Sequence, residues 1–507
     1  MKKIRRHSLL IVLIAYLLLG SLYSITVPLF EAPDERYHYG YVQHLASEHR
    51  LPTRGEDSPA GHEASQPPLY YAVAALSTAW RNPESRLALR PNRYFGNYQA
   101  PGTVNDNKNI LLHSDLERFP WEGAVLTVRI ARSVNLLFGA LTVGATYLLA
   151  REIFSRQLHA IYAAAIVALT PQFLFISSVI NNDIAASAFS TVTLWLLVGG
   201  VRRGVSISRA GLLGISIGLA ALSKVSTLAL VPLTLSVVAL NAWWRTTDLR
   251  PLQRLRLILG RSAIILGVAF VIGGWWYVRN FLLYDDPIGL QTHFETWWKY
   301  QEPLPLSALW SQLPGVALSF WAAFGMGNIH LPKAAYVFAM SLAFAAVVGL
   351  VCWVRQAWRA DRRPSSRAWS LAVLAVWFLM VLAALLRWMQ LVKAALGRLL
   401  FPAIGAIGVF VTLGLVQLAG HASRLIGQGE DADRRISCVV LGLFIGGLVC
   451  AAVASPFAVI KPVYAQPSLL SDAEVADHSD PISVHFGEGI QLVGYRVQIL
   501  MRKFVNL

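Results

Sequence analysis

The chain has 507 residues, of which 55% are hydrophobic and 14% are charged, whereas about a quarter of the residues of a soluble domain carry a charge. This composition excludes an ordinary soluble protein and predicts a polytopic membrane protein. The net charge of +16 would also suit a nucleic-acid partner, so the location of the basic residues decides between the two explanations.

The excess positive charge is confined to short segments between long apolar stretches. Six such segments contain 22 of the 44 Lys and Arg residues but only six of the 28 acidic residues, which accounts for the whole net charge of +16. A nucleic-acid-binding surface would gather its charge in one patch, whereas the cytoplasmic loops of a membrane protein share an excess of Lys and Arg. We therefore expect no nucleic-acid partner and place these segments in the cytoplasm: 1–7, 151–159, 201–209, 244–261, 355–369 and 420–436.

The N-terminal apolar stretch is the first of about 11 expected transmembrane helices. Residues 8–30 have the length that a span needs and lack a clear signal-peptide cleavage site, so we expect an uncleaved helix with a cytoplasmic N-terminus. Alternating sides from there predicts an all-α multi-pass membrane protein. The expected spans are 8–30, 125–150, 158–180, 184–200, 210–224, 225–243, 262–283, 334–354, 369–386, 399–419 and 437–455.

The apolar stretch 210–243 allows two interpretations. One tilted helix would put Arg209 and Arg245 on opposite sides of the membrane and would invert every later assignment. We therefore predict a hairpin of two short helices that turns near Ser223 and Lys224.

Three polar regions then lie outside. The first loop, 31–124, contains QPPLYYAVAALSTAW (66–80), which is too short to span and predicts a juxtamembrane helix at the interface. A second outer region, 284–333, has a similar segment at 309–321. Beyond residue 455, the alternating stretches ISVHF and IQLVGY predict β-strands. We expect a transmembrane catalytic domain at 1–455 and an extracytoplasmic tail at 456–507, a truncated β domain.

An acidic pair, Asp34 and Glu35, follows the first span directly in FEAPDERYHYGYVQHL (30–45). Acidic residues after Pro33 also suit a solvated helix N-terminus, so the pair alone does not establish a site. His38 would lie one turn further on the same helix face. Asp183 in VINNDIAAS falls at the expected outer end of the third span. Acids at one membrane depth on different helices favour a cavity at the outer leaflet.

The motifs resemble those of the GT-C superfamily of integral-membrane glycosyltransferases. PDE-x-x-H-x-x-Y-V after the first span is similar to their first-loop motif. HEASQPPLYY (62–71) is similar to an element of protein mannosyltransferase-like and aminoarabinose-transferase-like members. RIARSVNLLFGALTVGATYLLAREIF (129–154), SVINND and GLAALSKVSTLALVP (218–232) resemble their second span and later turns. GWWYVRNFLLYDDPIG, SFWAAFGMGNIHLP and LGRLLFP are similar to a related bacterial subgroup.

The resemblance implies a transfer of sugar from a polyprenyl-phosphate carrier at the outer face of a bacterial plasma membrane, with membrane lipids as partners. Asp34 matches the general base, and Glu35 would orient the acceptor or tune Asp34, since two adjacent carboxylates resist ionising together. The acceptor is a glycan, a lipid or a protein. Acceptor and sugar contacts are expected from the first loop: His38, His62, Glu63, Gln66 and Tyr70.

The leaving phosphate needs cations at the same depth, and four are expected there: Arg129, Lys224, Arg279 and Arg398. Arg suits phosphate because its planar fork bonds two oxygens. Lys224, between two apolar half-spans, is costly unless it faces water or an anion, although snorkelling to the interface would also explain it.

Two alternatives stay open. Asp34 and Asp183 form an oxygen-rich pair that could hold a divalent metal (Mg or Mn), and no other cofactor is expected. A transporter or flippase of lipids or lipid-linked sugars would also be polytopic, but it should carry its ionisable residues near mid-bilayer on several helices.

Overall fold

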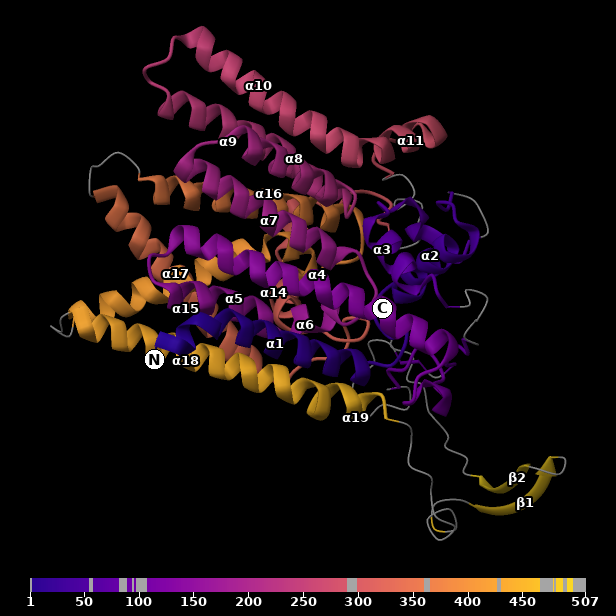
Figure 1. The fold of residues 1–507 in the computed structure, drawn as a ribbon. Helices are drawn as coiled ribbons and strands as arrows, with labels where there is room; N and C mark the ends of the chain where they lie inside the picture. Colours follow the sequence, from indigo (N-terminus) through magenta and orange to yellow (C-terminus); the bar gives the residue numbers. More distant parts are fainter. Residues whose placement is uncertain are drawn as a thin grey trace. The chain divides into compact units, whose positions relative to one another are not determined.

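A computed structural model gives the fold as two compact units, Met1–Val463 and Tyr464–Leu507. The first unit is a bundle of long helices (Figure 1). The residues that the structure describes are 2–53, 58–81, 89–93, 95–96, 107–289, 299–359, 365–425, 430–465, 477, 480–486 and 490–495.

Nine segments of the described chain are long and apolar enough to cross a membrane, which makes the protein multi-pass. Each coincides with one of the predicted spans. They are α1 (Lys2–Thr26), α4 (Gly123–Ile153), α7 (Asp183–Arg203), η3 (Val225–Ala229) with α9 (Leu230–Arg245), α10 (Pro251–Ala269) with α11 (Trp275–Tyr284), α15 (Lys333–Arg359), α16 (Ser366–Leu391), η5 (Gly397–Ala403) with α17 (Ile404–Leu425), and α18 (Glu430–Ala454) with α19 (Lys461–Val463).

The other two predicted spans are less regular. α5 (Gln157–Leu169) and α6 (Pro171–Ser177) are bent by 61°, because Pro171 pushes the preceding Thr170 out of the helical conformation. α8 (Ile207–Ala221) has 15 residues, which gives about 22 Å, short of the ~30 Å hydrocarbon core of a bilayer. The predicted number of 11 thus includes one bent pair and one short helix.

α8 and α9 form the predicted hairpin. Arg209 and Arg245 both donate hydrogen bonds to carbonyls at the C-terminal end of α7, within 201–204. Lys224, between them in sequence, donates instead to Asp183 at the N-terminal end of α7. Since α7 has 21 residues and is about 31 Å long, the chain must reverse at Lys224.

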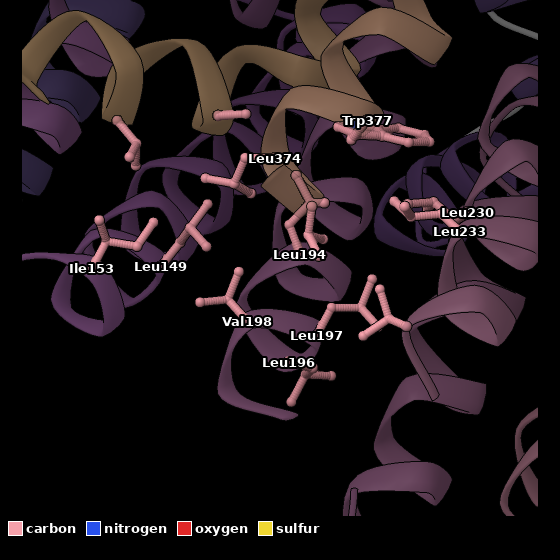
Figure 2. Close-up of a cluster of buried hydrophobic side chains, with 14 of the residues drawn as sticks. Leu149, Ile153, Leu194, Leu196, Leu197, Val198, Leu230, Leu233, Leu374 and Trp377 are labelled. Atoms are coloured by element: carbon pink, nitrogen blue, oxygen red, sulfur yellow. The ribbon is translucent and has the colours of Figure 1, made fainter. Parts of the chain in front are cut away.

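The centre of the bundle is apolar. Figure 2 shows part of this core, in which Leu194 and Leu197 of α7 lie among side chains of α4, α9 and α16. Of the apolar stretch of α7 that could cross a membrane, 78% is buried inside the protein. The corresponding share is 6% for the α10–α11 span, which lies at the edge of the bundle (Figure 1). α7 is therefore enclosed by the rest of the bundle, and Asn181 and Asn182 in the turn before it are buried as well.

The first loop folds into a small helical layer at one end of the bundle, which we call the first-loop end (Figure 1). Its elements are α2 (Glu35–Glu48), η1 (Gly61–Ser65), α3 (Leu69–Thr78) and η2 (Asp115–Glu117). Tyr41 and Tyr71 stack at 4.0 Å between α2 and α3. The predicted short helix is present as α3, and Leu76 and Trp80 are 75% and 68% exposed.

The second outer region supplies α13 (Leu306–Leu309) and α14 (Leu313–Trp321), over the predicted segment 309–321. α14 packs against η5. A Cβ on Gly397 of η5 would lie 2.3 Å from backbone atoms of Phe320 and of Val316. This approach, possible only for glycine, fixes the position of the next residue, Arg398.

The helical part of the chain continues past the predicted boundary at residue 455, through a π-helical turn (Ser455–Ile460) and α19. The second unit contains an antiparallel hairpin of β1 (Asp480–Phe486) and β2 (Ile490–Tyr495). These strands cover the two alternating stretches. The rest of the predicted tail domain falls largely outside the described residues.

Candidate functional site

Asp34 lies at the first-loop end, where the chain turns from α1 into α2. It is the N-cap residue of α2 and has a left-handed backbone (φ 60), which Asp tolerates better than most residues. Its side chain makes no capping hydrogen bond. Instead it faces Nε2 of His62 at 3.6 Å and the guanidinium of Arg398 at 3.9 Å, and it is 41% exposed. Asp34 is thus a carboxylate that a substrate can reach.

Glu35 points the other way, into the protein. Its carboxylate is fully buried and accepts two hydrogen bonds of 2.7 Å from Arg132. It also accepts from the backbone N–H groups of Phe30 and Ile180, both at 3.0 Å. These bonds tie the Asp34 loop to α4 and to the turn before α7. The expectation that Glu35 orients the acceptor is therefore corrected: its oxygens are engaged within the protein.

Arg132 was not predicted from the sequence. Besides Glu35 it binds the carbonyls of Val27 and Pro28 at the end of α1, at 2.8 and 2.9 Å. The repeated Arg in RIARS, at i and i+3 of one helix face, was the available signal.

Two first-loop residues connect Asp34 to α2. Nε2 of His62 lies 3.1 Å from Glu63, and Nδ1 of His38 lies 3.5 Å from the other oxygen of Glu63. His38 also shares a 2.8 Å hydrogen bond with the hydroxyl of Tyr71. The predicted residues His38, His62 and Glu63 are therefore brought together beside Asp34.

The charges in this group set each other's protonation. Burial lowers the pKa of His62, but its contacts with Asp34 and Glu63 outweigh burial and raise the pKa to about 10. Burial raises the pKa of Asp34, but the contact with His62 and the charge of Arg398 outweigh it, and the pKa lies below its ordinary value. At neutral pH the pair is an imidazolium and a carboxylate.

A second carboxylate, Asp183, joins the same group from the first turn of α7. Lys224 donates a hydrogen bond to it, and Arg398 lies 3.8 Å from its other oxygen. Arg398 therefore stands between Asp183 and Asp34. Four charged residues of alternating sign follow one another from Lys224 to Asp34, contributed by the α8–α9 turn, α7, η5 and the first loop.

This arrangement argues against the predicted metal pair. Asp34 and Asp183 have Arg398 between them, and its positive charge occupies the place that a shared divalent ion would need. Among the described residues, the ligand atoms of Asp34, His62 and Glu63 lie within 4.8 Å of one another. A metal there would have to displace the proton that both carboxylates hold on His62. The donor set fits a protonated bridge better than a cation.

The remaining predicted residues lie around this group. Gln66 accepts a 3.0 Å hydrogen bond from Asn182, which joins the first loop to the turn before α7. Arg129 is buried, donates to the Ser24 carbonyl and packs on Trp121. The structure does not bring Arg129 to Asp34.

Arg279 and Tyr70 are also placed differently from the prediction. Arg279 donates to the Pro52 carbonyl at 3.0 Å and lies over the ring of Trp276. Tyr70 is fully buried and donates to the Ala131 carbonyl at 2.9 Å. The expectation that Tyr70 contacts a sugar is therefore wrong, and its neighbour Tyr71 supplies the ring beside His38.

A set of hydrogen bonds to Glu31, at the end of α1, holds the first loop in place without being part of the site. Glu31 is fully buried and accepts from the N–H groups of Ile110 and Leu111 and from His113 at 2.9 Å. His113 also contacts Glu117. Burial lowers the pKa of His113, but the two carboxylates raise it to about 9. These contacts attach residues 107–117 to the segment that carries Asp34.

The sequence model of the family described as dolichyl-phosphate-mannose-protein mannosyltransferase matches residues 127–271. The match confirms the resemblance over this part of the chain, which includes Asp183 and Lys224. No curated protein matches the chain.

Similar solved structures include ArnT from Cupriavidus metallidurans bound to undecaprenyl phosphate, with 16% identity, TM-score 0.47, and coverage of 90% of this chain and 74% of that one. The apo oligosaccharyltransferase of Archaeoglobus fulgidus has 14% identity and TM-score 0.44, and the match covers 88% of this chain. The chain spans 56% of the archaeal protein's length. The S. cerevisiae Pmt1–Pmt2 complex bound to the sugar donor has 15% identity and TM-score 0.35, with 55% of this chain and 34% of that one covered.

Proposed function

We propose that the protein is a glycosyltransferase that moves a sugar from a polyprenyl-phosphate carrier to a hydroxyl acceptor on a glycan, a lipid or a protein. One observation carries the proposal. A solvent-accessible carboxylate, Asp34, lies within reach of Arg398, in a row of charges that ends at Lys224, at the end of a membrane-spanning bundle. The match of residues 127–271 to the mannosyltransferase family supports the same chemistry.

Asp34 acts as the general base. A hydroxyl is a poor nucleophile until it loses its proton during attack. Asp34 is ionised at neutral pH, since its pKa lies below the ordinary value, so it accepts the acceptor's proton while the acceptor oxygen bonds to the anomeric carbon. The bond from that carbon to the phosphate oxygen breaks, its electron pair leaves with the phosphate, and the configuration inverts.

Lys224 and Arg398 receive the leaving phosphate. Charge develops on the phosphate oxygen as the bond breaks, and fixed cations stabilise it best when they are already in place. Arg398 is 11% and Lys224 23% exposed, so water screens them only in part. Both lie near the N-terminus of α7, whose unpaired N–H groups add a positive potential.

The site faces the extracytoplasmic side of a bacterial plasma membrane. The arginine-rich loops lie at the end of the bundle opposite to Asp34, as the contacts of Arg202 and Arg203 with Glu152 illustrate. If these loops are cytoplasmic, Asp34 meets the outer leaflet, where a carrier lipid exposes its activated sugar.

The test is transfer of labelled sugar from a panel of polyprenyl-phosphate donors by membranes that contain wild type or Asp34→Asn. We expect the variant to lose about 10²- to 10⁴-fold in rate while it still folds and inserts into the membrane. Asp115→Asn is the matched control, because Asp115 is an exposed acid whose ion pair with Arg118 lies outside the site.

Equal rates for wild type and Asp34→Asn would remove Asp34 from the chemistry. If wild type uses no donor of the panel but moves fluorescent polyprenyl-phosphate lipids across vesicle membranes, the chain is a flippase and the proposal fails.

A further inference from the structure

The phosphate site proposed above is already occupied by an anion of the protein itself. Asp183 takes the hydrogen bond of Lys224 and the charge of Arg398. We propose that Asp183 is a resident counter-ion that the carrier's phosphate displaces on binding and that returns to expel the product. This inference rests on the proposed function, because it concerns the same site.

The contacts of Lys224 make the displacement plausible on energetic grounds. Within the part of the chain that the structure describes, Asp183 is the only carboxylate within 4.0 Å of Lys224. A partly buried ammonium between apolar half-spans is costly without an anion, so it holds Asp183 until a better anion arrives. A phosphate offers more oxygens and at least the same charge.

Arg398 is held more loosely than a structural arginine. Its closest approaches to Asp183 and Asp34 are 3.8 and 3.9 Å, longer than hydrogen bonds. Its Nε is buried and has no hydrogen-bond partner among the described residues. A planar guanidinium with an unused donor can turn toward a phosphate and bind two of its oxygens at once.

The α7 N-terminus gives a third contribution. Asp183 is the first residue of this 21-residue helix, and the turn before it is fixed by the bond from its N–H to Asn181. The first N–H groups of a helix lack intrahelical acceptors and attract an anion. The Asp183 side chain satisfies this potential only while no phosphate is present.

The counter-ion also has a consequence for turnover. The donor is a phosphodiester with one negative charge, whereas the released carrier phosphate is a monoester whose charge is closer to two. Repulsion from Asp183 grows with the charge of the ligand. Asp183 therefore disfavours the product more than the donor, and it speeds release from a site that would otherwise be a strong phosphate trap.

The test measures binding of undecaprenyl phosphate, the product-like probe, to the full chain in nanodiscs. We expect Asp183→Asn to bind the probe about tenfold more tightly than wild type, and Lys224→Ala about tenfold more weakly. Asp115→Asn, which removes an exposed acid elsewhere, should bind as wild type does. Asp183→Asn should also turn over more slowly, with stronger inhibition by added undecaprenyl phosphate.

A second measurement, of melting temperature, distinguishes a change in binding from a loss of folding. Asp183→Asn leaves Lys224 without its carboxylate and Arg398 with Asp34 alone, so its melting temperature should fall, and the probe should restore it by a larger increment than it adds to wild type. If Asp183→Asn binds the probe as weakly as Lys224→Ala does, Asp183 is part of the binding site and the displacement is wrong. If wild type does not bind the probe at all, both the proposed donor class and this inference fail.

Discussion

Asp34 and Glu35 are neighbours in sequence, but they belong to two clusters with opposite properties. Glu35 and Arg132 are fully buried, share two bonds of 2.7 Å, and spend their other bonds on backbone groups. Asp34 and Arg398 are 3.9 Å apart, and the carboxylate is 41% exposed. The polar atoms of Glu35 and Arg132 are all engaged within the protein, whereas Asp34 and Arg398 keep polar atoms that a substrate can bind. The two arginines differ most clearly: Arg132 is held by hydrogen bonds, whereas Arg398 approaches Asp34 and Asp183 only at 3.9 and 3.8 Å.

The largest expected effect comes from removing the buried Glu35–Arg132 ion pair. Glu35→Gln leaves the Arg132 cation buried without its anion, which costs about 3–5 kcal/mol of unfolding free energy. Thermal unfolding in detergent should show a clearly lowered melting temperature and loss of activity. Adding Arg132→Met to Glu35→Gln should recover part of the stability, because the uncompensated charge is then removed.

Arg118→Met is the matched control for that experiment. Its ion pair with Asp115 has a similar length, 3.1 Å, but the side chains are 72% and 79% exposed, so its loss should cost under ~1 kcal/mol. If Glu35→Gln melts at the same temperature as Arg118→Met, the buried pair is not the support that its geometry suggests.

The next effect concerns the placement of Arg398 and leaves the Glu35–Arg132 pair intact. Gly397→Ala puts a Cβ 2.3 Å from the backbone of α14, so η5 must shift and carry Arg398 with it. A displacement of about 1 Å can reduce the rate by up to ~100-fold. Activity per folded protein should fall, and the melting temperature should fall as well, because the Cβ meets backbone atoms and not the end of a flexible side chain.

Gly315→Ala on α14 is the control, because its Cβ would meet nothing within 4 Å. Unchanged activity in Gly397→Ala would mean that Arg398 needs no fixed position, and the contrast between the two clusters would lose its basis.

The sequence predicted the elements of both clusters unevenly, for reasons that particular residues make clear. Asp34 was singled out because it follows an apolar span directly and matches the first-loop motif of the family that the chain resembles, and Lys224 because a charge between apolar half-spans is costly. The spans and the α8–α9 hairpin followed from hydropathy and from the distribution of arginine. These signals are local or additive, so a sequence displays them.

The pairings could not be predicted in the same way. Glu35 meets Arg132 across 97 positions, and no local pattern says which of two adjacent acids faces inward. Tyr70 and Tyr71 differ by one helical position, about 100°, so the expectation for Tyr70 depended on a helix phase that the apolar run QPPLYYAVAAL does not fix. Arg129 was expected beside phosphate, but Trp121 and the Ser24 carbonyl hold it elsewhere.

The smallest expected effect is a shift in the pH dependence of activity when His62, which contacts both Asp34 and Glu63, is replaced. In His62→Gln the carboxylate loses its imidazolium neighbour, so burial is opposed less and the pKa of Asp34 rises. The base must be ionised to work, so the acid limb of kcat/KM should move to higher pH while the plateau above it changes little. If the acid limb does not move, His62 does not influence the ionisation of Asp34.

Stability gives an independent reading of the same bridge. The pKa of His62 is raised to about 10 in the folded protein, above the ~6.5 of an unfolded chain. Its contribution is therefore complete below about pH 6.5 and is lost as the pH rises through 10. Wild type should lose more melting temperature between pH 7 and pH 10 than His62→Gln does. His49→Asn, at an exposed histidine that ends α2 in a left-handed conformation which Asn also adopts, should lose as much as wild type. If His62→Gln and wild type fall in parallel, the histidine is not a charged bridge, and the lowered pKa of Asp34 would come from the charges of Arg398 and His38.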